Sequence, residues 1–199
     1  MREAERRYYE RRAPEYDDWY LGRALFADYE RPGWDEELDA LVGLLESLPP
    51  RRVLDVACGT GFLTQHLEGE VTGIDQSEEM LEVARERSPN TTFLRADGLA
   101  LPFSDESFDL VFTAHFYGHL REPDRGRFLA EARRVAPELL VVDTALRPGV
   151  AAEELQERVL GDGSRHEVYK RYFTPEVLAD ELGGGRVLQA GSWFVAVAA

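Results

Sequence analysis

The sequence is poor in cysteine and has no long apolar run. Its single cysteine, Cys58, excludes an intrachain disulfide and suits a reducing compartment. The first residues, MREAERRYYERR, carry charges where a secretory signal peptide has an apolar segment. No stretch approaches the ~20 apolar residues that a transmembrane helix needs. We therefore expect a cytoplasmic protein that does not insert into a membrane.

Basic residues are also scarce. The 199 residues include 38 Asp and Glu against 23 Lys and Arg, which gives a formal net charge of −15. Proteins that bind long nucleic acids neutralise phosphates with Lys and Arg, whereas this surface repels phosphates on average. We therefore expect no long nucleic acid as a partner. The N-terminal arginines are mixed with glutamates, as on a solvated helix face: Arg2, Arg6, Arg7, Arg11 and Arg12.

Metal-ligand patterns and internal repeats are missing as well. We expect no metal, because the four histidines lack the spacing of zinc ligands. They are His66, His115, His119 and His166. Without repeats or low-complexity stretches, the simplest organisation is a single domain at residues 35–199. It follows a helical, aromatic-rich segment at residues 1–34 and contains an insert at residues 148–174.

The order of apolar and amphipathic stretches predicts alternating strands and helices. Asp35 and Ser77 are the expected N-caps of two of the helices, and Pro49-Pro50 ends the first. Strands that alternate with helices form a mostly parallel, doubly wound α/β sheet. Apolar runs predict strands at residues 53–56, 71–74, 92–94, 108–113 and 139–142. Helical spacing predicts helices at residues 35–48, 60–67, 78–87, 124–135 and 175–182.

The end of the chain departs from this alternation. Residues 186–189 and 193–197 are both typical of strands. The connection between them, Ala190-Gly191-Ser192, is too short for a parallel crossover, which needs about a dozen residues. We therefore expect these two strands to form an antiparallel hairpin at an edge of the sheet.

A glycine-rich turn follows the strand at residues 53–56. Gly59 and Gly61 lie where a strand of an α/β sheet ends, which is where such sheets bind ligands. Glycine has no Cβ and lets the backbone approach a ligand closely. Asp75 ends the next strand, where its carboxylate can accept hydrogen bonds from both ribose hydroxyls, each worth about 1.5–3 kcal/mol. These residues predict a cofactor that contains ribose.

Two further positions indicate which cofactor fits. The dinucleotide fingerprint has a third glycine where this chain has Thr64. Asp55, on the strand before the loop, repels a pyrophosphate but attracts a ligand that carries an ammonium and a sulfonium. Charge therefore favours S-adenosylmethionine over NAD.

The motifs around this loop resemble those of a known family. LDVACGTGFLT and VTGIDQSEEML closely resemble the cofactor motifs of class I S-adenosylmethionine-dependent methyltransferases. The resemblance is strongest to the small-molecule branch that includes enzymes of ubiquinone and menaquinone biosynthesis. It continues through RADGLALPFSDESFDLVFTAHFYGHL and covers residues 51–142. It implies a Rossmann-like, seven-stranded sheet with an antiparallel last strand. One departure, Ala136-Pro137-Glu138 in place of a Lys-Pro-Gly-Gly turn, is expected far from the cofactor.

The resemblance also implies a set of cofactor contacts. Asp55, Gly59 and Gly61 would surround the methionine end of S-adenosylmethionine, and Asp75 would hold the ribose. Asp97 would accept the adenine amino group, although an Asp before a glycine also suits a simple turn. The other implied contacts are Ala57, Cys58, Phe62, Gln76, Met80, Gly98, Leu99 and Tyr16. Cys58 also suits a packing position in the turn, and Met80 a buried position on its helix.

The residues after the strand at 108–113 are candidates for catalysis. Methyl transfer is an in-line displacement, and good alignment alone is worth up to about 7–11 kcal/mol. His115 and His119 titrate in the range of a general base, and Tyr117 is a candidate to orient the acceptor. Alternatively, His119 caps a helix and His115 lines the methionine arm. The chain lacks the Asn/Asp-Pro-Pro-Tyr/Phe signature of DNA methyltransferases and the Asp-Asn pair of catechol-type enzymes.

Two segments are candidates for a lid over the substrate. Residues 1–34 suit a lid built from Tyr8, Tyr16 and Trp19, and equally a helix packed on the sheet. The insert carries cationic residues, including Arg165 and Lys170, that would select an acidic acceptor.

We expect a monomer or homodimer that transfers a methyl group to a small-molecule acceptor. The alternatives are a non-catalytic S-adenosylmethionine-binding regulatory protein and, less favoured, a nicotinamide-dependent oxidoreductase.

Overall fold

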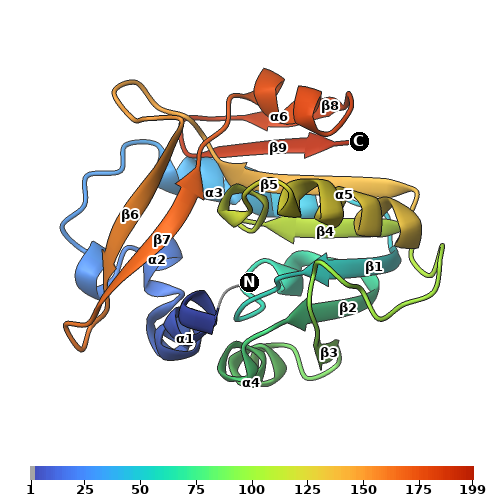
Figure 1. The fold of residues 1–199 in the computed structure, drawn as a ribbon, viewed down its shortest axis with the longest axis horizontal. Coiled ribbons are helices and arrows are strands. Elements are labelled where there is room, and N and C mark those ends of the chain that lie inside the picture. Colours follow the sequence, from blue (N-terminus) through green and yellow to red (C-terminus); the bar gives the residue numbers. More distant parts are fainter. Residues whose placement is uncertain (1–2) are drawn as a thin grey trace.

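The computed structural model describes residues 3–199, with side chains from residue 7 onward, so Arg2 and the side chain of Arg6 lie outside the described residues. Its centre is a seven-stranded sheet with helices packed against it (Figure 1). In spatial order the strands are β3 (Thr92–Arg95), β2 (Gly69–Asp75), β1 (Arg51–Val56), β4 (Leu110–Ala114), β5 (Glu138–Thr144), β9 (Phe194–Ala198) and β8 (Arg186–Ala190).

The direction of the strands confirms the expected architecture. Strands β1 to β5 pair in parallel, and β9 runs antiparallel to both of its neighbours, β5 and β8. The last two strands form the predicted hairpin, and β8 is the edge strand. The order reverses beside β1, which lies between β2 and β4, so the carboxyl ends of these strands face the crevice where α/β sheets bind ligands.

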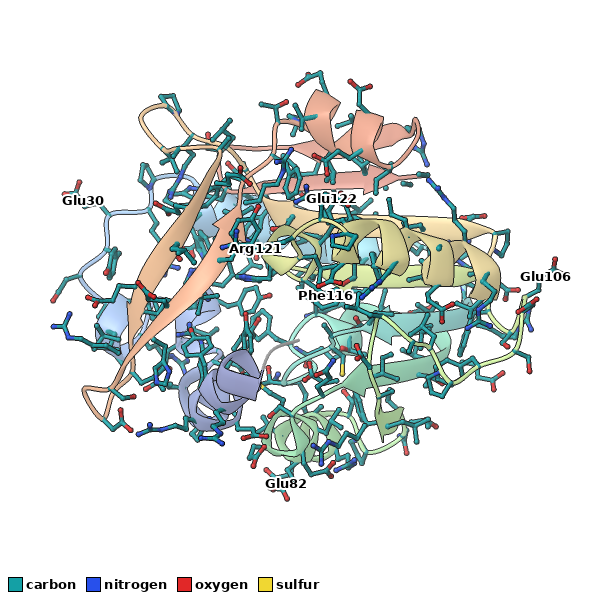
Figure 2. The ribbon with its side chains drawn as sticks, viewed as in Figure 1. Glu30, Glu82, Glu106, Phe116, Arg121 and Glu122 are labelled. Atoms are coloured by element: carbon teal, nitrogen blue, oxygen red, sulfur yellow. The ribbon has the colours of Figure 1, made fainter. Side chains whose placement is uncertain are left out.

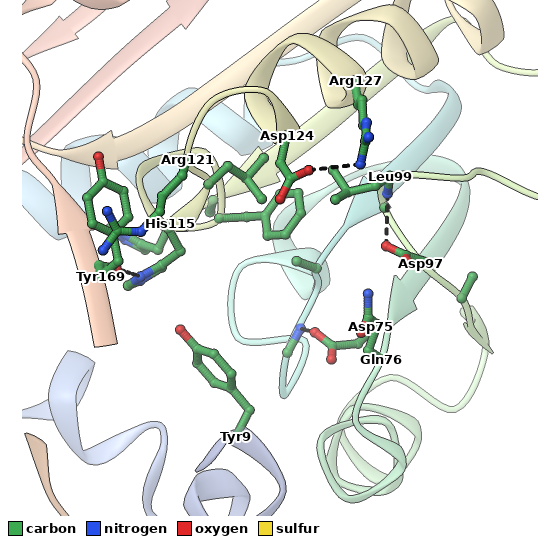
Figure 3. A pocket seen from close by; sticks show the side chains of 18 of the residues that line it. Tyr9, Asp75, Gln76, Asp97, Leu99, His115, Arg121, Asp124, Arg127 and Tyr169 are labelled. Carbon is green, nitrogen blue, oxygen red and sulfur yellow. Dashed lines mark hydrogen bonds and ion pairs between the residues drawn. The ribbon is translucent and has the colours of Figure 1, made fainter. Parts of the chain in front are cut away.

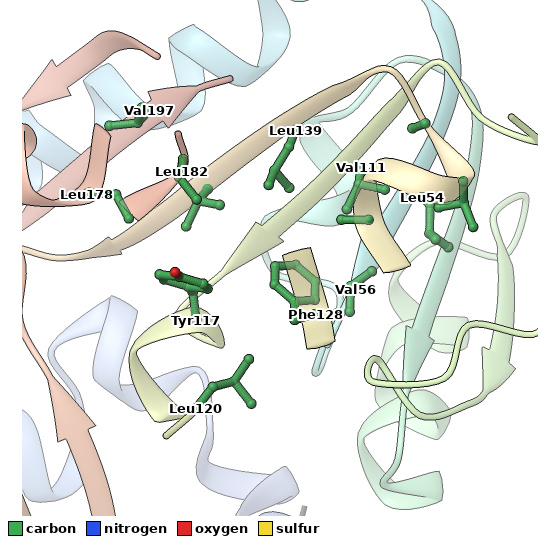
Figure 4. Packing of buried hydrophobic residues seen from close by; sticks show 14 of the residues in the cluster. Leu54, Val56, Val111, Tyr117, Leu120, Phe128, Leu139, Leu178, Leu182 and Val197 are labelled. Carbon is green, nitrogen blue, oxygen red and sulfur yellow. The ribbon is translucent and has the colours of Figure 1, made fainter. Parts of the chain in front are cut away.

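Both faces of the sheet are buried, which explains why its strands are apolar along their length. One face packs on α5 (Asp124–Val135) and α6 (Pro175–Glu181), with Phe128, Leu178 and Val111 in the cluster shown in Figure 4. The other face packs on α3 (Trp34–Glu46), whose Leu41 and Leu45 are fully buried. These two layers hold the carboxyl ends of the strands in fixed positions.

One of the two predicted N-caps is confirmed and the other needs correction. Ser77 caps α4 (Glu78–Arg87) as predicted, and its hydroxyl accepts a hydrogen bond from the Met80 amide. Asp35 is not the N-cap of α3, because Gly33 takes that position with a left-handed φ of 76°. The same helix ends at Glu46, before Pro49-Pro50.

The helix predicted at residues 60–67 is wrong. Only a 3-10 turn, η3 (Thr64–His66), forms there. Gly59 and Gly61 have φ values of 55° and 72°, which keep the chain in a loop before the turn.

The insert at residues 148–174 contains strands that the sequence pattern did not predict. β6 (Glu153–Val159) and β7 (Arg165–Arg171) form a two-stranded antiparallel hairpin, separate from the main sheet. In Figure 1 this hairpin, in orange, crosses the ends of the central strands beside the N-terminal segment. It therefore extends over the edge where ligands are expected.

The N-terminal segment is helical, with one part on the sheet and another beside the hairpin. Trp19 and Tyr20 belong to the cluster that includes α3, and the Trp34 indole donates to the Tyr20 carbonyl at 2.9 Å. Tyr8 is buried against Leu160 and Val168 of the hairpin region. The elements are α1 (Glu3–Arg12), η1 (Ala13–Glu15), α2 (Asp18–Leu21) and η2 (Ala24–Phe26). In residues 3–199 no helix is both long and apolar enough to cross a membrane.

Candidate active site

A cavity of about 790 Å³ opens at the carboxyl ends of β1, β2 and β4 (Figure 3). One wall is made by the loops that follow these strands and includes Asp75 and Asp97. The opposite wall is made by Tyr9 and Tyr16 of the N-terminal segment and by Tyr169 of β7. The expected cofactor loop and both lid candidates therefore contribute to one cavity.

The loop after β1 approaches the cavity closely. Ala57 and Gly59 both line it, and both have left-handed φ values, 60° and 55°. A Cβ on Gly59 would lie 3.7 Å from the Tyr16 ring. The loop thus presents its backbone to the cavity, with an aromatic ring from the N-terminal segment across from it.

Asp75, at the end of β2, is held by backbone amides. Its Oδ2 accepts a hydrogen bond from the Gly59 amide at 3.1 Å, and its Oδ1 accepts one from the Ser77 amide at 2.8 Å. Burial raises the pKa of Asp75, while the hydrogen bonds from these amides and from Gln76 oppose the rise. Each carboxylate oxygen keeps lone pairs for a ligand in the cavity.

The remaining residues of this wall come from the same few segments. Asp97 Oδ1 accepts a hydrogen bond from the Leu99 amide at 3.0 Å, which forms a turn and leaves its other oxygen for a ligand. A Cβ on Gly98 would lie 2.7 Å from a methyl group of Val56, so only glycine fits there. The predicted cofactor residues that line the cavity are Tyr16, Ala57, Gly59, Asp75, Gln76, Met80, Asp97, Gly98 and Leu99.

Asp55 lies behind this wall rather than in it. It is 2% exposed, and its carboxylate accepts a hydrogen bond from the Thr64 hydroxyl at 2.6 Å. Burial raises the pKa of Asp55 to about 7, although the Thr64 hydrogen bond lowers it. With Cys58 and Phe62, Asp55 lines a small adjoining cavity of about 20 Å³. Gly61 lines neither cavity and packs against Ala84 of α4.

His119 lies in η4 (Tyr117–His119) and lines the large cavity. Its Nδ1 lies 2.6 Å from the Tyr169 carbonyl oxygen. A carbonyl oxygen can only accept, so Nδ1 carries the proton and Nε2 keeps a free lone pair. Burial, followed by the charges of Lys170 and Arg158, lowers the pKa of His119 well below its usual value. His119 is therefore a neutral imidazole whose tautomer is fixed.

His115 also lines the cavity but is more deeply enclosed. It is 9% exposed and has a left-handed φ of 56°. Its Nδ1 lies 3.4 Å from the Thr144 hydroxyl, and its buried Nε2 has no hydrogen-bond partner. Burial lowers the pKa of His115 to about 3. The Trp19 ring packs edge-on against it, with ring centroids 5.0 Å apart.

The role predicted for Tyr117 as a residue that orients the acceptor does not fit the structure. Tyr117 is 1% exposed and packs in the core cluster of Figure 4. Its hydroxyl donates to the Glu181 carboxylate of α6 at 3.1 Å, and Tyr117 is not among the residues that line the cavity. Within the short turn η4 the side chains of His119 and Tyr117 point in different directions. Their spacing along the chain did not predict this.

The structure adds residues that the sequence analysis missed. Tyr9, Tyr169 and Arg121 line the cavity, and the Arg121 guanidinium lies 3.9 Å from the centre of the Tyr169 ring. Tyr9 belongs to an N-terminal segment noted for its aromatic residues, and Tyr169 to the insert. No feature of the sequence pointed to Arg121 as a site residue, because a single arginine after a predicted strand is common.

The two cations that the sequence analysis selected in the insert are already paired. Lys170 Nζ lies 2.6 Å from Asp143 Oδ1 of β5, and both side chains are buried. Arg165 is exposed and pairs with Glu157 on the neighbouring strand. Neither cation has a free charge to offer to an acceptor.

Comparison with known proteins finds methyltransferases. Residues 53–138 match the model of a methyltransferase domain. The fold, the cofactor-loop motifs and this match are those of class I S-adenosylmethionine-dependent methyltransferases, and the resemblance seen in the sequence is confirmed.

Individual relatives fall in the same class. A demethylmenaquinone methyltransferase of Thermotoga maritima is 37% identical over 134 residues, which cover 65% of this chain and 55% of the relative. The chain thus spans about half the length of the curated relatives it matches. A structure described as a DhpI–SAM–HEP complex superposes with a TM-score of 0.79 at 26% identity and covers 98% of this chain and 95% of that chain. A DhpI–SAH complex gives 0.74 at 26% identity, with 98% and 94% covered.

Proposed function

We propose that this protein transfers the methyl group of S-adenosylmethionine to a small-molecule acceptor. The observation that carries the proposal is Asp75, whose amide-held carboxylate stands in the cavity wall beside the glycine loop. A carboxylate at the end of the second strand of such a sheet is placed to accept both ribose hydroxyls. Asp97, Gly98 and Leu99 continue the same wall and suit an adenine ring.

The charges at this end of the cavity favour a cationic cofactor over a dinucleotide. Asp75 lines the loop and Asp55 lies just behind it, while the cationic residues that line the cavity, Arg121 and Arg127, belong to the segment after β4. A pyrophosphate at Gly59 would face two carboxyl groups. A sulfonium and an ammonium would be attracted by them.

The cofactor, when bound, supplies a methyl group on a positively charged sulfur. An acceptor lone pair would take this methyl group in line with the carbon–sulfur bond, and S-adenosylhomocysteine would be the second product. The chain aligns the acceptor for this displacement and takes up a proton where the acceptor releases one. His119 is the best-placed proton acceptor, because its Nε2 lone pair is free and its ring lines the cavity.

The acceptor shares the cavity with the cofactor, so its size is limited. A cavity of about 790 Å³ admits S-adenosylmethionine and a compact acceptor. Because the Thermotoga maritima relative carries the name demethylmenaquinone methyltransferase, a quinol belongs in the first acceptor screen. We further propose a cytoplasmic location, which cell fractionation would test. We also propose a monomeric or homodimeric state, which light scattering of the purified protein would test.

Calorimetric titration tests the cofactor proposal directly. We expect S-adenosylmethionine and S-adenosylhomocysteine to bind at micromolar concentration and NADH not to bind. Asp75→Ala should abolish both interactions. Asp109→Ala is the matched control, since Asp109 pairs with Arg52 at the opposite end of the strands. Binding of NADH alone would overturn the proposal in favour of an oxidoreductase.

Turnover separates the enzyme from a non-catalytic cofactor-binding protein. Tritium transfer from labelled S-adenosylmethionine to small phenols, quinols, amines and acids supports the enzyme. Tight cofactor binding without transfer to any acceptor would favour a regulatory role.

A further inference from the structure

Three consecutive residues of the N-terminal segment contact three different parts of the molecule. Glu15 contacts the hairpin, where its Oε2 accepts a hydrogen bond from the Gly161 amide at 2.8 Å. Tyr16 lines both the large cavity and the small adjoining one. Asp17 contacts the loop after β1, where its Oδ1 accepts a hydrogen bond from the Thr60 hydroxyl at 2.6 Å. The residue that lines the cavities therefore has a carboxylate contact on each side of it.

Asp17 also joins the N-terminal segment to α4. Its second carboxylate oxygen, Oδ2, pairs with the guanidinium of Arg87, the last residue of that helix. Acids such as Glu30 and Glu82 project outward (Figure 2), whereas the Asp17 side chain is 20% exposed. A partly buried ion pair is screened by salt less than a fully exposed one. Both oxygens of Asp17 thus connect the segment to the cofactor side of the molecule.

Thr60 is the point where these contacts meet. It stands between Gly59 and Gly61 and is 1% exposed. Its hydroxyl donates to Asp17, and its carbonyl accepts a hydrogen bond from Arg87 Nη1 at 2.7 Å. Glycines on either side give the loop backbone much conformational freedom, which contacts with Thr60 restrict. Asp17 and Arg87 therefore hold the loop and the N-terminal segment to one another.

The Tyr16 ring packs on the loop that is held in this way. A Cβ on Gly59 would lie 3.7 Å from the ring. Because the ring and Gly59 both line the large cavity, a ligand bound at the loop meets the ring at its side. Further along the segment, Tyr20 stacks on Phe62, with ring centroids 4.1 Å apart. The stacked rings anchor the segment, and Asp17 lies next to Tyr16 in the chain.

Asp17 does not itself face a ligand in this site. It lines neither of the two cavities, because its carboxylate is directed to Thr60 and Arg87. An effect of Asp17 on ligand affinity must therefore be transmitted by a neighbour that does line the site, and Tyr16 is that neighbour.

We infer that Asp17 is a positioning residue for the cofactor and that, through Thr60 and Arg87, it holds the Tyr16 ring beside the bound S-adenosylmethionine. This inference rests on the proposed methyltransferase function and adds a residue to the same site. A ring that is already in place costs less ordering when the cofactor binds. Without the carboxylate, the segment next to the ring is no longer tied to the loop, and the cofactor binds more weakly.

Binding of S-adenosylhomocysteine to the full chain, measured by calorimetry, tests the inference. We expect Asp17→Ala to weaken binding at least tenfold. Asp17→Asn keeps an oxygen for the Thr60 hydroxyl but loses the charge that pairs with Arg87, so its affinity should lie between those of Asp17→Ala and the unaltered protein. Asp28→Ala removes an exposed acid of the same segment and is the matched control, which should bind as the unaltered protein does.

A double-variant cycle shows whether Asp17 acts through the ring. Tyr16→Ala should weaken binding at least tenfold. Adding Asp17→Ala to Tyr16→Ala should cause less than a further threefold loss, because the ring that Asp17 positions is already missing. Independent, multiplying losses in the double variant would overturn the inference. Unchanged affinity in either single variant would overturn it as well.

Unfolding in urea separates positioning from loss of the fold. Each variant should unfold in one cooperative transition, and the affinity losses should not follow the order of the stability losses. If Asp17→Ala does not fold, the same cycle with Asp17→Asn decides the question. If the unaltered protein does not bind S-adenosylhomocysteine, the proposed function itself fails, and the inference fails with it.

Discussion

The two walls of the cavity are built in different ways. The cofactor wall comes from one short stretch of chain, residues 57–99, and Asp75 is held by amides only 2 and 16 residues away. The opposite wall brings together residues from the N-terminal segment, from the loop after β4 and from the hairpin. Its ties span the sequence: His119 meets Tyr169, and Lys170 meets Asp143.

This difference explains why the residues of one wall can be predicted from a sequence and those of the other cannot. Contacts within a motif follow from the geometry of its strand, loop and helix. The motif therefore predicts the positions of the residues that make these contacts. Contacts between distant segments depend on how the N-terminal segment and the hairpin pack on the sheet. Variants in both walls test this contrast, and those that break a contact of the hairpin come first.

The largest effect is expected from Lys170→Met. This change removes the partner of Asp143, which is 0% exposed, and leaves a buried carboxylate without a compensating charge. Breaking a buried pair in this way costs about 3–5 kcal/mol. The free energy of unfolding, measured in urea, should fall by that amount.

A second variant isolates the buried charge as the cause. Lys170→Met combined with Asp143→Asn leaves no buried charge and should be more stable than Lys170→Met alone. Arg165→Gln breaks only an exposed pair and should change stability by less than about 1 kcal/mol. A double variant as unstable as Lys170→Met would show that the loss comes from packing.

Catalysis should depend on His119 far more than on His115. His119→Gln keeps a donor for the Tyr169 carbonyl but removes the basic nitrogen, so kcat with a proton-releasing acceptor should fall about 100-fold. His115→Asn tolerates the left-handed φ of 56° and should reduce kcat less than tenfold. Steady-state kinetics and cofactor titration of both variants check this, with unchanged cofactor affinity expected. Equal losses of kcat would remove the distinction between the two histidines.

The prediction of the fold was accurate where residues close together in the sequence determine the structure. Ser77 caps α4 because a hydroxyl at that position bonds the Met80 amide whatever surrounds it. The C-terminal hairpin followed from the length of its connection. The prediction of a helix at residues 60–67 was wrong, because two glycines with left-handed conformations keep the chain in a loop despite the helical spacing of its apolar residues. The hairpin β6–β7 escaped notice because charged residues dominate its outer face.

The candidate site shows the same limit. Asp75 and Asp97 could be proposed from motif position, and the structure brings them to one cavity wall. Tyr117 could not be separated from His119, because the two lie in one turn and are distinguished by contacts with α6 and β7.

Stability should respond to pH through the buried His115. Its pKa is about 3 in the folded chain and 6.5 ordinarily, so the unfolded chain binds a proton more tightly. Folding stability contributed by this group is therefore lost as the pH falls from 6.5 toward 3, by about 2 kcal/mol at pH 5. His115→Asn should reduce the difference in free energy of unfolding between pH 7.5 and pH 5 by that amount.

The contribution of a second buried group, Asp55, does not disturb this comparison. Asp55 acts in the opposite direction, because its raised pKa of about 7 favours folding as the pH falls. Both His115→Asn and the unaltered protein retain Asp55, so its effect cancels in their difference. An unchanged difference in His115→Asn would show that His115 titrates normally in the folded chain.

The smallest effect is expected in the cofactor wall itself, from Ser77→Ala. This change removes the N-cap of α4, which costs about 1 kcal/mol, while the Ser77 amide still donates to Asp75. Unfolding in urea should show that loss, and the affinity for S-adenosylhomocysteine should change less than threefold. Ser77→Thr keeps the capping hydroxyl and should recover most of the stability. A large loss of cofactor affinity in Ser77→Ala would mean that the cap, and not the backbone alone, positions Asp75.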